Sequence, residues 1–205
     1  MIAIIDYGMG NLKSLSNAMN KLDIDFFFLD NAKSSKPFTH IIVPGVGSYP
    51  VAMNEIKKRG LVDFIFNQRK YNTPILGICL GMQIFSYKGS EGNRLSEGLK
   101  FIDGTVENIS ELEPLNKCHV GWNNIKIIKN SKIFENIKND THFYFDHSYF
   151  FKNKSPDNIL CETKYKKTFS SGVIENNLIG LQFHPEKSHD KGLIILKNFY
   201  KNFNA

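Results

Sequence analysis

Residues 73–87 constrain what this chain can fold into more than any other stretch. An apolar run at residues 73–78 predicts a short buried strand, and its proline stands near the start, where a missing N–H does least harm to a sheet. Residues 80–87 have the apolar spacing of a helix with one buried face. Cys79 lies between them, and Gly77 and Gly81 leave room for a sharp turn. The stretch therefore predicts a strand, a turn at a cysteine and a helix.

A thiol at such a corner is placed to act as a nucleophile. The first turn of a helix has unpaired N–H groups and a positive dipole end, and both favour a thiolate. The same N–H groups can hold the oxyanion that forms when a thiolate attacks a carbonyl. The layout matches the nucleophile elbow of hydrolases, with cysteine in place of serine. A free cysteine in an apolar strand is more often an inert core residue, so Cys79 alone leaves both interpretations open.

The first 87 residues alternate short apolar strands with amphipathic helices. The expected strands lie at residues 1–6, 25–29, 40–43 and 73–78. The expected helices lie at residues 12–22, 51–59, 61–69 and 80–87. This alternation predicts the α/β class, with a doubly wound, mainly parallel, flavodoxin-like sheet that has helices on both faces.

After residue 97 the pattern changes to strand-like segments with short connections. These segments lie at residues 101–109, 124–128, 142–151, 159–164, 169–175 and 178–183. They predict an additional antiparallel β region in the C-terminal half, packed against the parallel part, and residues 192–203 predict a closing amphipathic helix. Because no linker or repeat interrupts the chain, residues 1–205 are expected to form one domain.

Three turns follow expected strands at the same edge of the predicted sheet, where ligands bind in doubly wound folds. The turn at residues 6–11 contains two glycines but lacks a full G-x-G-x-x-G, so a nucleotide site is not favoured there. The loop at residues 44–48 contains Gly45 and Gly47, which let backbone N–H groups point at a substrate oxygen. A plain strand-to-helix turn fits that loop equally well. Cys79 is the third corner at this edge.

Residues 181–188, with the sequence LQFHPEKS, contain the second half of a candidate site. His184 follows a strand, Pro185 restricts the backbone after it, and the Glu186 carboxylate can reach the imidazole. Histidine is the side chain that can activate a thiol near neutral pH. His184 alone is more often structural, but together with the cysteine elbow it predicts a triad of Cys79, His184 and Glu186.

Composition excludes several other classes of protein. No apolar run approaches the roughly 20 residues of a membrane span, and the apolar start reads as a strand. The net charge of +6 comes from scattered lysines, so nucleic acid is not an expected partner. The three cysteines are odd in number and widely spaced, which favours a reducing cytoplasm over a disulfide framework.

Two motifs carry a resemblance to a known family. The sequences GICLGMQ at residues 77–83 and QFHPEKS at residues 182–188 resemble the class I glutamine amidotransferases. Four further motifs resemble the glutaminase subunits of imidazole glycerol phosphate synthases, which act in histidine biosynthesis. They lie at residues 6–11, 44–47, 119–123 and 147–149. The resemblance covers essentially the whole chain.

The resemblance implies a role for each matching residue. Cys79 would attack the side-chain amide of glutamine to form a thioester, His184 would move the proton, and Glu186 would orient His184. The backbone N–H groups of Leu80 and of the loop at Val46 and Gly47 would form the oxyanion hole, and the loop is expected to rearrange when a partner binds. The substrate's amino-acid end would be held by Gly47, Gln83, Glu91, Ser148 and Tyr149. Glutamate and ammonia would be the products, and no cofactor or metal is implied.

The same resemblance implies a partner subunit. Ammonia would pass directly into a cyclase of the (β/α)8-barrel type, with which this subunit would form a heterodimer. The cyclase would use the ammonia to form imidazole glycerol phosphate and AICAR. The positions that would face this partner are Asn11, Trp122, Tyr144 and Lys187. Trp122 and Lys187 are also consistent with ordinary packing and a solvated charge.

One departure from the family pattern bears on the partner contact and the loop movement, and one further resemblance keeps an alternative pathway open. Asp146 precedes His147, where these subunits usually have a small apolar residue. His189, Asp190 and Gly192 resemble a paralogous branch of glutaminase subunits that supplies ammonia to a synthase amidating a surface-polysaccharide or nonulosonic sugar. Both branches share the glutaminase residues, so the ammonia acceptor is left open.

Three other classes are weaker interpretations. A metal site would draw on residues such as Cys118, His119, His142 and His147, but their spacing fits no zinc pattern. A non-catalytic homologue would normally lack Cys79 or His184. A peptidase would share the elbow but differ in its substrate.

Overall fold

The computed structural model describes residues 1–33, 36–92, 94–115 and 117–204, so the predicted domain boundary at residue 205 lies outside the described residues. Within these ranges, the main sheet has eight strands in the order β2-β1-β3-β4-β14-β13-β12-β9. The strands of its parallel part are β1 (Ile2–Ile5), β2 (Phe26–Leu29), β3 (His40–Val43), β4 (Ile75–Ile78) and β14 (Leu178–Leu181). The antiparallel part continues the same sheet with β13 (Lys167–Glu175), β12 (Ile159–Tyr165) and β9 (Lys126–Ile127).

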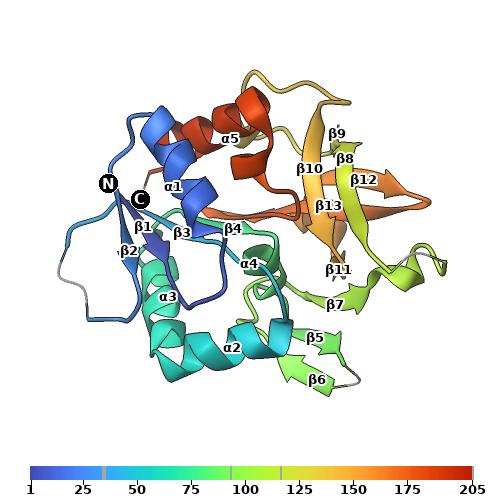
Figure 1. Cartoon of the computed structure of the whole chain (residues 1–205), viewed down its shortest axis with the longest axis horizontal. Coiled ribbons are helices and arrows are strands. Elements are labelled where there is room, and N and C mark those ends of the chain that lie inside the picture. The colour runs from blue at the N-terminus through green and yellow to red at the C-terminus, as the bar shows by residue number, and fades with distance from the viewer. Residues whose placement is uncertain (34–35, 93, 116, 205) are drawn as a thin grey trace.

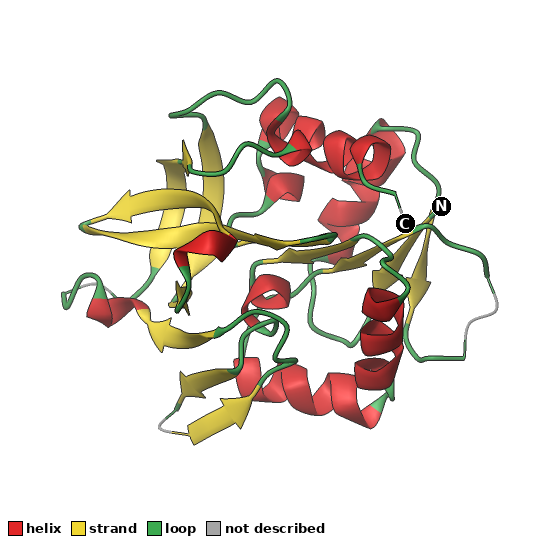
Figure 2. Cartoon of the chain, turned by 180° about the vertical axis from the view of Figure 1, so that it is seen from behind, coloured by secondary structure: helices red, strands yellow, loops and turns green. Residues whose placement is uncertain are grey.

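Two smaller sheets lie beside the main one. A two-stranded antiparallel sheet pairs β8 (His119–Asn124) with β10 (His142–His147). The other sheet has the order β11-β7-β5-β6 and contains β5 (Lys88–Glu91), β6 (Arg94–Glu97), β7 (Gly104–Asn108) and β11 (Tyr149–Asn153). The antiparallel region therefore extends the parallel sheet as well as packing beside it, where the sequence predicted only packing. Figure 2 shows the β12–β13 hairpin reaching out to the side away from the long helices.

Helices cover both faces of the parallel strands. Helices α1 (Leu12–Lys21) and α5 (His189–Asn202) lie on one face, whereas α2 (Tyr49–Lys58), α3 (Leu61–Lys70) and the short α4 (Leu80–Gln83) lie on the other (Figure 1). Short 3-10 helices complete the chain: η1 (Ile109–Glu111), η2 (Lys132–Phe134), η3 (Pro156–Asn158) and η4 (Pro185–Lys187). The predicted doubly wound sheet with helices on two sides is confirmed.

The core follows the same division. On the face of α1 and α5, Leu15 and Ile195 pack with Ile4 of β1 in one apolar cluster. On the opposite face, Ile56 of α2 and Ile65 of α3 join a second cluster. The four residues of β1 are completely buried, as expected for a strand covered on both faces.

The prediction of a helix at residues 80–87 was wrong beyond residue 83. Helix α4 ends at Gln83, and the N–H groups that would continue it bond differently. Phe85 and Ser86 N–H groups donate to the carbonyls three residues back, and Tyr87 N–H donates to the Gly104 carbonyl at 3.1 Å. Tighter turns and one tertiary hydrogen bond therefore end the helix after a single turn, although the apolar spacing continues.

Other boundaries also differ from the sequence expectation. The predicted strand at residues 142–151 is two strands in different sheets, because the backbone changes direction at Ser148, whose carbonyl accepts from Ile109 N–H at 2.9 Å. The β5–β6 hairpin and most of β8 were not predicted. Helices α2 and α5 begin two and three residues earlier than expected, at Tyr49 and His189.

Among the described residues, no helix is both long and apolar enough to cross a membrane.

Candidate active site

Cys79 occupies a sharp corner between β4 and α4. Its φ of 53° and ψ of −109° are unusual for a residue with a side chain. Its N–H donates to the carbonyl of Leu181 at 2.7 Å, and its own carbonyl accepts from Met82 and Gln83 N–H groups at 3.0 and 3.1 Å. These three bonds hold the predicted elbow in place, with the cysteine only 5% exposed.

Glycines make this corner possible. A Cβ on Gly81 would lie 1.8 Å from the carbonyl oxygen of Val43, and a Cβ on Gly77 would lie 2.6 Å from the carbonyl oxygen of Gly81. No side chain fits at either position, so the elbow packs directly on β3. The sequence interpretation of the two glycines as space for a tight turn is correct.

Glu186 lies in η4, and His184 precedes that short helix, shortly after β14. The Nδ1 atom of His184 and the Oε1 atom of Glu186 are 2.7 Å apart, and both side chains are almost completely buried. The His184 N–H donates to the carbonyl of Tyr144 at 2.8 Å, while its carbonyl accepts from the Ser188 hydroxyl at 2.6 Å. The backbone and one ring nitrogen of His184 are thus fixed, which orients the imidazole.

The second ring nitrogen, Nε2, is buried and has no hydrogen-bond partner among the described residues. Burial by itself lowers the pKa of His184. Its electrostatic interactions with Cys79 and Glu186 raise that pKa, and the net result lies well above the ordinary histidine value. The imidazolium form is therefore favoured when a negative charge develops on the Cys79 sulfur.

A cavity of about 280 Å³ opens beside Cys79. All five predicted substrate residues line it: Gly47, Gln83, Glu91, Ser148 and Tyr149. Gly47 and Gln83 follow the neighbouring parallel strands β3 and β4, whose carboxyl ends lie together. Glu91, Ser148 and Tyr149 come from or next to the smaller sheet of β5 and β11. His184 and Glu186 do not line the cavity, so Cys79 is the triad residue that faces it.

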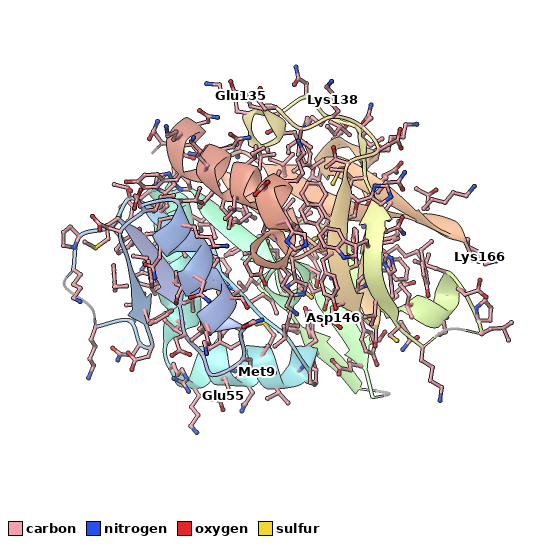
Figure 3. All side chains as sticks on the ribbon, turned by 45° about the horizontal axis from the view of Figure 1, so that its top comes forward. Met9, Glu55, Glu135, Lys138, Asp146 and Lys166 are labelled. Atoms are coloured by element: carbon pink, nitrogen blue, oxygen red, sulfur yellow. The ribbon has the colours of Figure 1, made fainter. Side chains whose placement is uncertain are left out.

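Two of the backbone N–H groups expected to form an oxyanion hole, those of Leu80 and Val46, are already hydrogen-bonded. Leu80 N–H donates to the carbonyl of Gly45 at 3.3 Å, and Val46 N–H donates to the carbonyl of Met9 at 3.3 Å. The same peptide unit supplies the Gly45 carbonyl and the Val46 N–H. Figure 3 shows Met9, after β1, and Asp146, on β10, on the same face of the molecule.

Comparison with known proteins identifies the family. The sequence profile described as glutamine amidotransferase class-I matches residues 3–203. The chain belongs to the class I glutamine amidotransferases.

Relatives within this family match over nearly the full length. The imidazole glycerol phosphate synthase subunit HisH of Bdellovibrio bacteriovorus is 39% identical, with 97% of this chain and 98% of that protein covered. The protein of the same name from Caldanaerobacter subterraneus subsp. tengcongensis is 42% identical, with 97% of each covered. The structure of PurLQS from Thermotoga maritima has a TM-score of 0.77 at 16% identity, covering 98% of this chain and 97% of that one, which supports the fold.

One residue of this amidotransferase site was missed by the sequence analysis. Gln182 is completely buried, and its Nε2 lies 3.5 Å from the Cys79 sulfur. The Oε1 atom of Gln182 accepts from Gln83 Nε2 at 3.1 Å. Gln83 Nε2 also donates to the carbonyl of Tyr149 at 2.8 Å. A glutamine at the end of an otherwise apolar strand was the available signal.

Three of the four predicted partner residues of the amidotransferase form one surface cluster. The rings of Trp122 and Tyr144 are 6.1 Å apart, and Lys187 Nζ lies 5.3 Å from the Tyr144 ring. Trp122 is 47% exposed and stacks on His189. The fourth, Asn11, instead caps α1 by accepting from Ser14 N–H at 3.3 Å.

The cysteine and histidines of the weaker metal-site interpretation do not converge on one point among the described residues. His119 Nδ1 and His147 Nε2 lie 3.0 Å apart, so the two rings bond to each other. Cys118 is exposed, and no group of three or more His, Cys, Asp or Glu side chains suited to a metal occurs in the described part of the chain.

Proposed function

We propose that this chain is the glutaminase subunit of imidazole glycerol phosphate synthase, and that it hydrolyses glutamine to glutamate and ammonia. The observation that carries the proposal is the buried Cys79–His184–Glu186 group, in which Glu186 holds one imidazole nitrogen at 2.7 Å and the interaction of the imidazole with Cys79 raises the pKa of His184. Relatives named HisH, matched over nearly their whole length, support the same assignment.

The triad can divide the hydrolysis into two steps. His184 Nε2 takes the proton of the Cys79 thiol, and the sulfur attacks the amide carbon of the substrate. The imidazolium then gives its proton to the departing nitrogen, which leaves as ammonia, and a thioester remains on Cys79. Water attacks the thioester while His184 accepts its proton, which releases glutamate. Glu186 keeps Nδ1 protonated and stabilises the imidazolium throughout.

The cavity residues hold the amino-acid end of glutamine. Gln83 is oriented by its bonds to Gln182 and to the Tyr149 carbonyl, and Glu91 accepts from Tyr49 N–H at 2.6 Å. These fixed polar groups supply partners for the α-ammonium and α-carboxylate of the substrate. A small rigid site of this kind lowers the entropy cost of placing the amide against the sulfur.

The oxyanion loop, residues 44–47, is at rest in this arrangement. One rotation of the peptide unit between Gly45 and Val46 breaks both 3.3 Å bonds and releases the N–H groups of Leu80 and Val46 together. Both bonds are long for N–H···O, so they are readily exchanged. The chain alone is therefore expected to have low activity, and binding of the partner is expected to turn this peptide.

The partner is a cyclase subunit of the (β/α)8-barrel type that forms imidazole glycerol phosphate and AICAR. Direct transfer prevents ammonia from becoming ammonium in water. The cluster of Trp122, Tyr144 and Lys187 supplies an aromatic and cationic contact surface of the kind that anchors protein interfaces.

The deciding experiment measures glutamate release by the purified chain, alone and with the cyclase subunit and its ligand. Stimulation by about tenfold or more, equivalent to about 1.4 kcal/mol in the barrier, is expected with the cyclase. Stimulation only by a sugar-amidating synthase would keep the chemistry and replace the acceptor. Glutamate release that no partner changes would contradict the subunit assignment.

The nucleophile has its own test in the same assay. Replacing Cys79 with alanine is expected to lower kcat to below about one thousandth, because the thioester cannot form. Binding to the cyclase, measured by calorimetry, should persist. Near-normal turnover by the C79A variant would disprove the mechanism.

A further inference from the structure

Tyr7 carries a buried hydroxyl that the chemistry above does not use. Its side chain is 1% exposed, and its hydroxyl has no hydrogen-bond partner among the described residues. Buried hydroxyl groups are nearly always bonded, because an unbonded one loses its water without compensation. The resting state is therefore unfavourable at this atom, and a second state that satisfies it would gain stability.

The hydroxyl lies against the oxyanion loop. A Cβ built on Gly45 would lie 2.2 Å from the Tyr7 oxygen and 2.9 Å from the Cβ of Leu80. Tyr7, Gly45 and Leu80 therefore meet at one point, although they come from three separate segments of the chain. The carbonyl of Gly45 is the group that occupies the Leu80 N–H in the resting state.

Turning the peptide between Gly45 and Val46 leaves a second buried atom, the Gly45 carbonyl oxygen, without its hydrogen bond. The Gly45 carbonyl then loses its donor, and Gly45 is buried, so water does not replace that donor. Tyr7 has an unused donor in contact with the same residue. The resting state leaves the Tyr7 hydroxyl unbonded, and the turned state would leave the Gly45 oxygen unbonded unless the two groups bond to each other.

We propose that Tyr7 is a positioning residue whose hydroxyl donates to the Gly45 carbonyl in the turned state of the oxyanion loop. The bond keeps that carbonyl away from Leu80, so the Leu80 and Val46 N–H groups stay directed at the oxyanion. This inference rests on the proposed glutaminase function. Burial, with a smaller contribution from Cys79, raises the pKa of Tyr7 far above its ordinary value, so the hydroxyl remains a donor.

The test replaces Tyr7 with phenylalanine and measures glutamine hydrolysis in the complex with the cyclase subunit and its ligand. We expect kcat to fall roughly tenfold with KM within twofold of the unchanged chain, because one hydrogen bond of the active loop is lost and the substrate cavity is untouched. Alkylation of Cys79 by iodoacetamide should keep its rate, since that reaction forms no oxyanion.

Stability provides a readout of opposite sign. The Y7F variant should have a melting temperature equal to or above that of the unchanged chain, because an unbonded buried hydroxyl is removed. Tyr165→Phe is the matched control. The Tyr165 hydroxyl donates to the Cys118 carbonyl at 3.0 Å, so Y165F should lose a little stability and keep its kcat.

Each other outcome overturns the proposal. A kcat of Y7F within twofold of the unchanged complex would show that the hydroxyl does not support the active loop. A lowered melting temperature, or failure to fold, would show that the hydroxyl already has a partner in the resting state. If the cyclase does not stimulate the unchanged chain, the subunit assignment fails first, and that result is visible before any variant is compared.

Discussion

At the scale of single residues, Cys79 combines an unfavourable backbone conformation with the proposed role of nucleophile. Such a conformation costs about 1–3 kcal/mol and persists only where neighbouring bonds enforce it. Here the Leu181 carbonyl and the first turn of α4 enforce it. The strain places the sulfur beside both the cavity and Gln182, where a relaxed strand would bury it in the sheet.

Two other histidines form a chain of hydrogen bonds behind the substrate cavity. The carbonyl of Tyr149 can only accept, so His147 donates from Nδ1 at 2.9 Å and accepts at Nε2 from His119 Nδ1, 3.0 Å away. The Nε2 atom of His119 then accepts from Asn123 Nδ2 at 3.1 Å. Each ring is therefore held in one neutral tautomer, and the chain fixes the carbonyl to which Gln83 also donates.

This pair predicts sensitivity to acid. Burial, reinforced by the nearby His119 and His184, lowers the pKa of His147 to about 3, and burial lowers that of His119 to about 4. In the unfolded chain these histidines bind protons below pH 6.5, the ordinary pKa of histidine. In the folded chain they stay neutral until the pH approaches 4 and 3. Stability should therefore fall as pH falls below 6.5, by about 2 kcal/mol for His147 between pH 6.5 and 5.

The measurement is urea unfolding at pH 7, 6 and 5. The pKa of His184 is raised in the folded chain, so its contribution has the opposite sign: it still grows as pH falls from 7 to 6, where the unfolded histidine titrates, and it is nearly complete below pH 6. His147→Gln should be less stable at pH 7 but should lose less on acidification. His142→Gln is the control, because that side chain is exposed. Equal acid slopes for H147Q and the unchanged chain would refute the assignment.

At the scale of elements, the elbow depends on how closely α4 approaches β3. A side chain on Gly81 would collide with the Val43 carbonyl at 1.8 Å, and backbone atoms cannot move aside cheaply. Gly81→Ala is therefore expected to lower the free energy of unfolding by at least about 3 kcal/mol and to abolish glutaminase activity. Thermal unfolding and the glutamate assay test both parts.

Gly10→Ala is the matched control for this prediction. Gly10 lies in the turn after β1, and a Cβ there would meet Leu12 and Pro44 side chains at 3.4 Å, an ordinary contact. Its stability should change by less than about 1 kcal/mol. If Gly81→Ala is as mild as Gly10→Ala, the elbow has more freedom than its packing indicates.

The same elements show why some boundaries were predictable. Strands β1, β3 and β4 are short, completely buried apolar runs between turn residues, and the sequence located each within two residues. The apolar spacing after Gln83 also looks helical, but Tyr87 N–H donates to the Gly104 carbonyl and not to that of Gln83. Local spacing cannot reveal an acceptor that lies 17 residues away.

At the scale of the whole molecule, one ion pair spans the edge between the active site and the predicted partner surface. Lys187 Nζ lies 3.4 Å from Asp146 Oδ2, with 26% and 45% of the side chains exposed. The Asp146 carbonyl lies 3.8 Å from the Cys79 sulfur. The carboxylate that departs from the family pattern therefore pairs with a lysine expected to face the partner.

Removing this carboxylate is expected to strengthen partner binding. Asp146→Ala releases Lys187 for the cyclase, and because an exposed pair is worth at most about 1 kcal/mol, the Kd should fall by up to about fivefold. The gain should shrink as salt is raised. Calorimetric titration with the cyclase at two salt concentrations measures both effects.

Glu97→Ala provides the comparison for a pair of the same kind. Glu97 bonds Lys100 at 2.8 Å on the connection after β6, and its removal should leave the Kd unchanged. Weaker binding by the D146A variant would mean that Asp146 itself contacts the partner.

The sequence by itself determined the family and the class of fold, and it predicted the chemistry of the site. The cysteine elbow, the His-Pro-Glu turn and the alternation of strands and helices are patterns of neighbouring residues, and neighbouring residues set turns and periodicity. Most of the later strands were also recognisable, except β5, β6 and most of β8, but their sheets were not, because pairing depends on partners far away in the chain.

Only the tertiary structure decided how the site stands at rest. The occupied N–H groups of Leu80 and Val46, the bond of Gln182 to Cys79 and the unbonded hydroxyl of Tyr7 each depend on atoms from separate segments. A hydrogen bond forms or fails over tenths of an ångström, and such distances are set by the packing of the whole core.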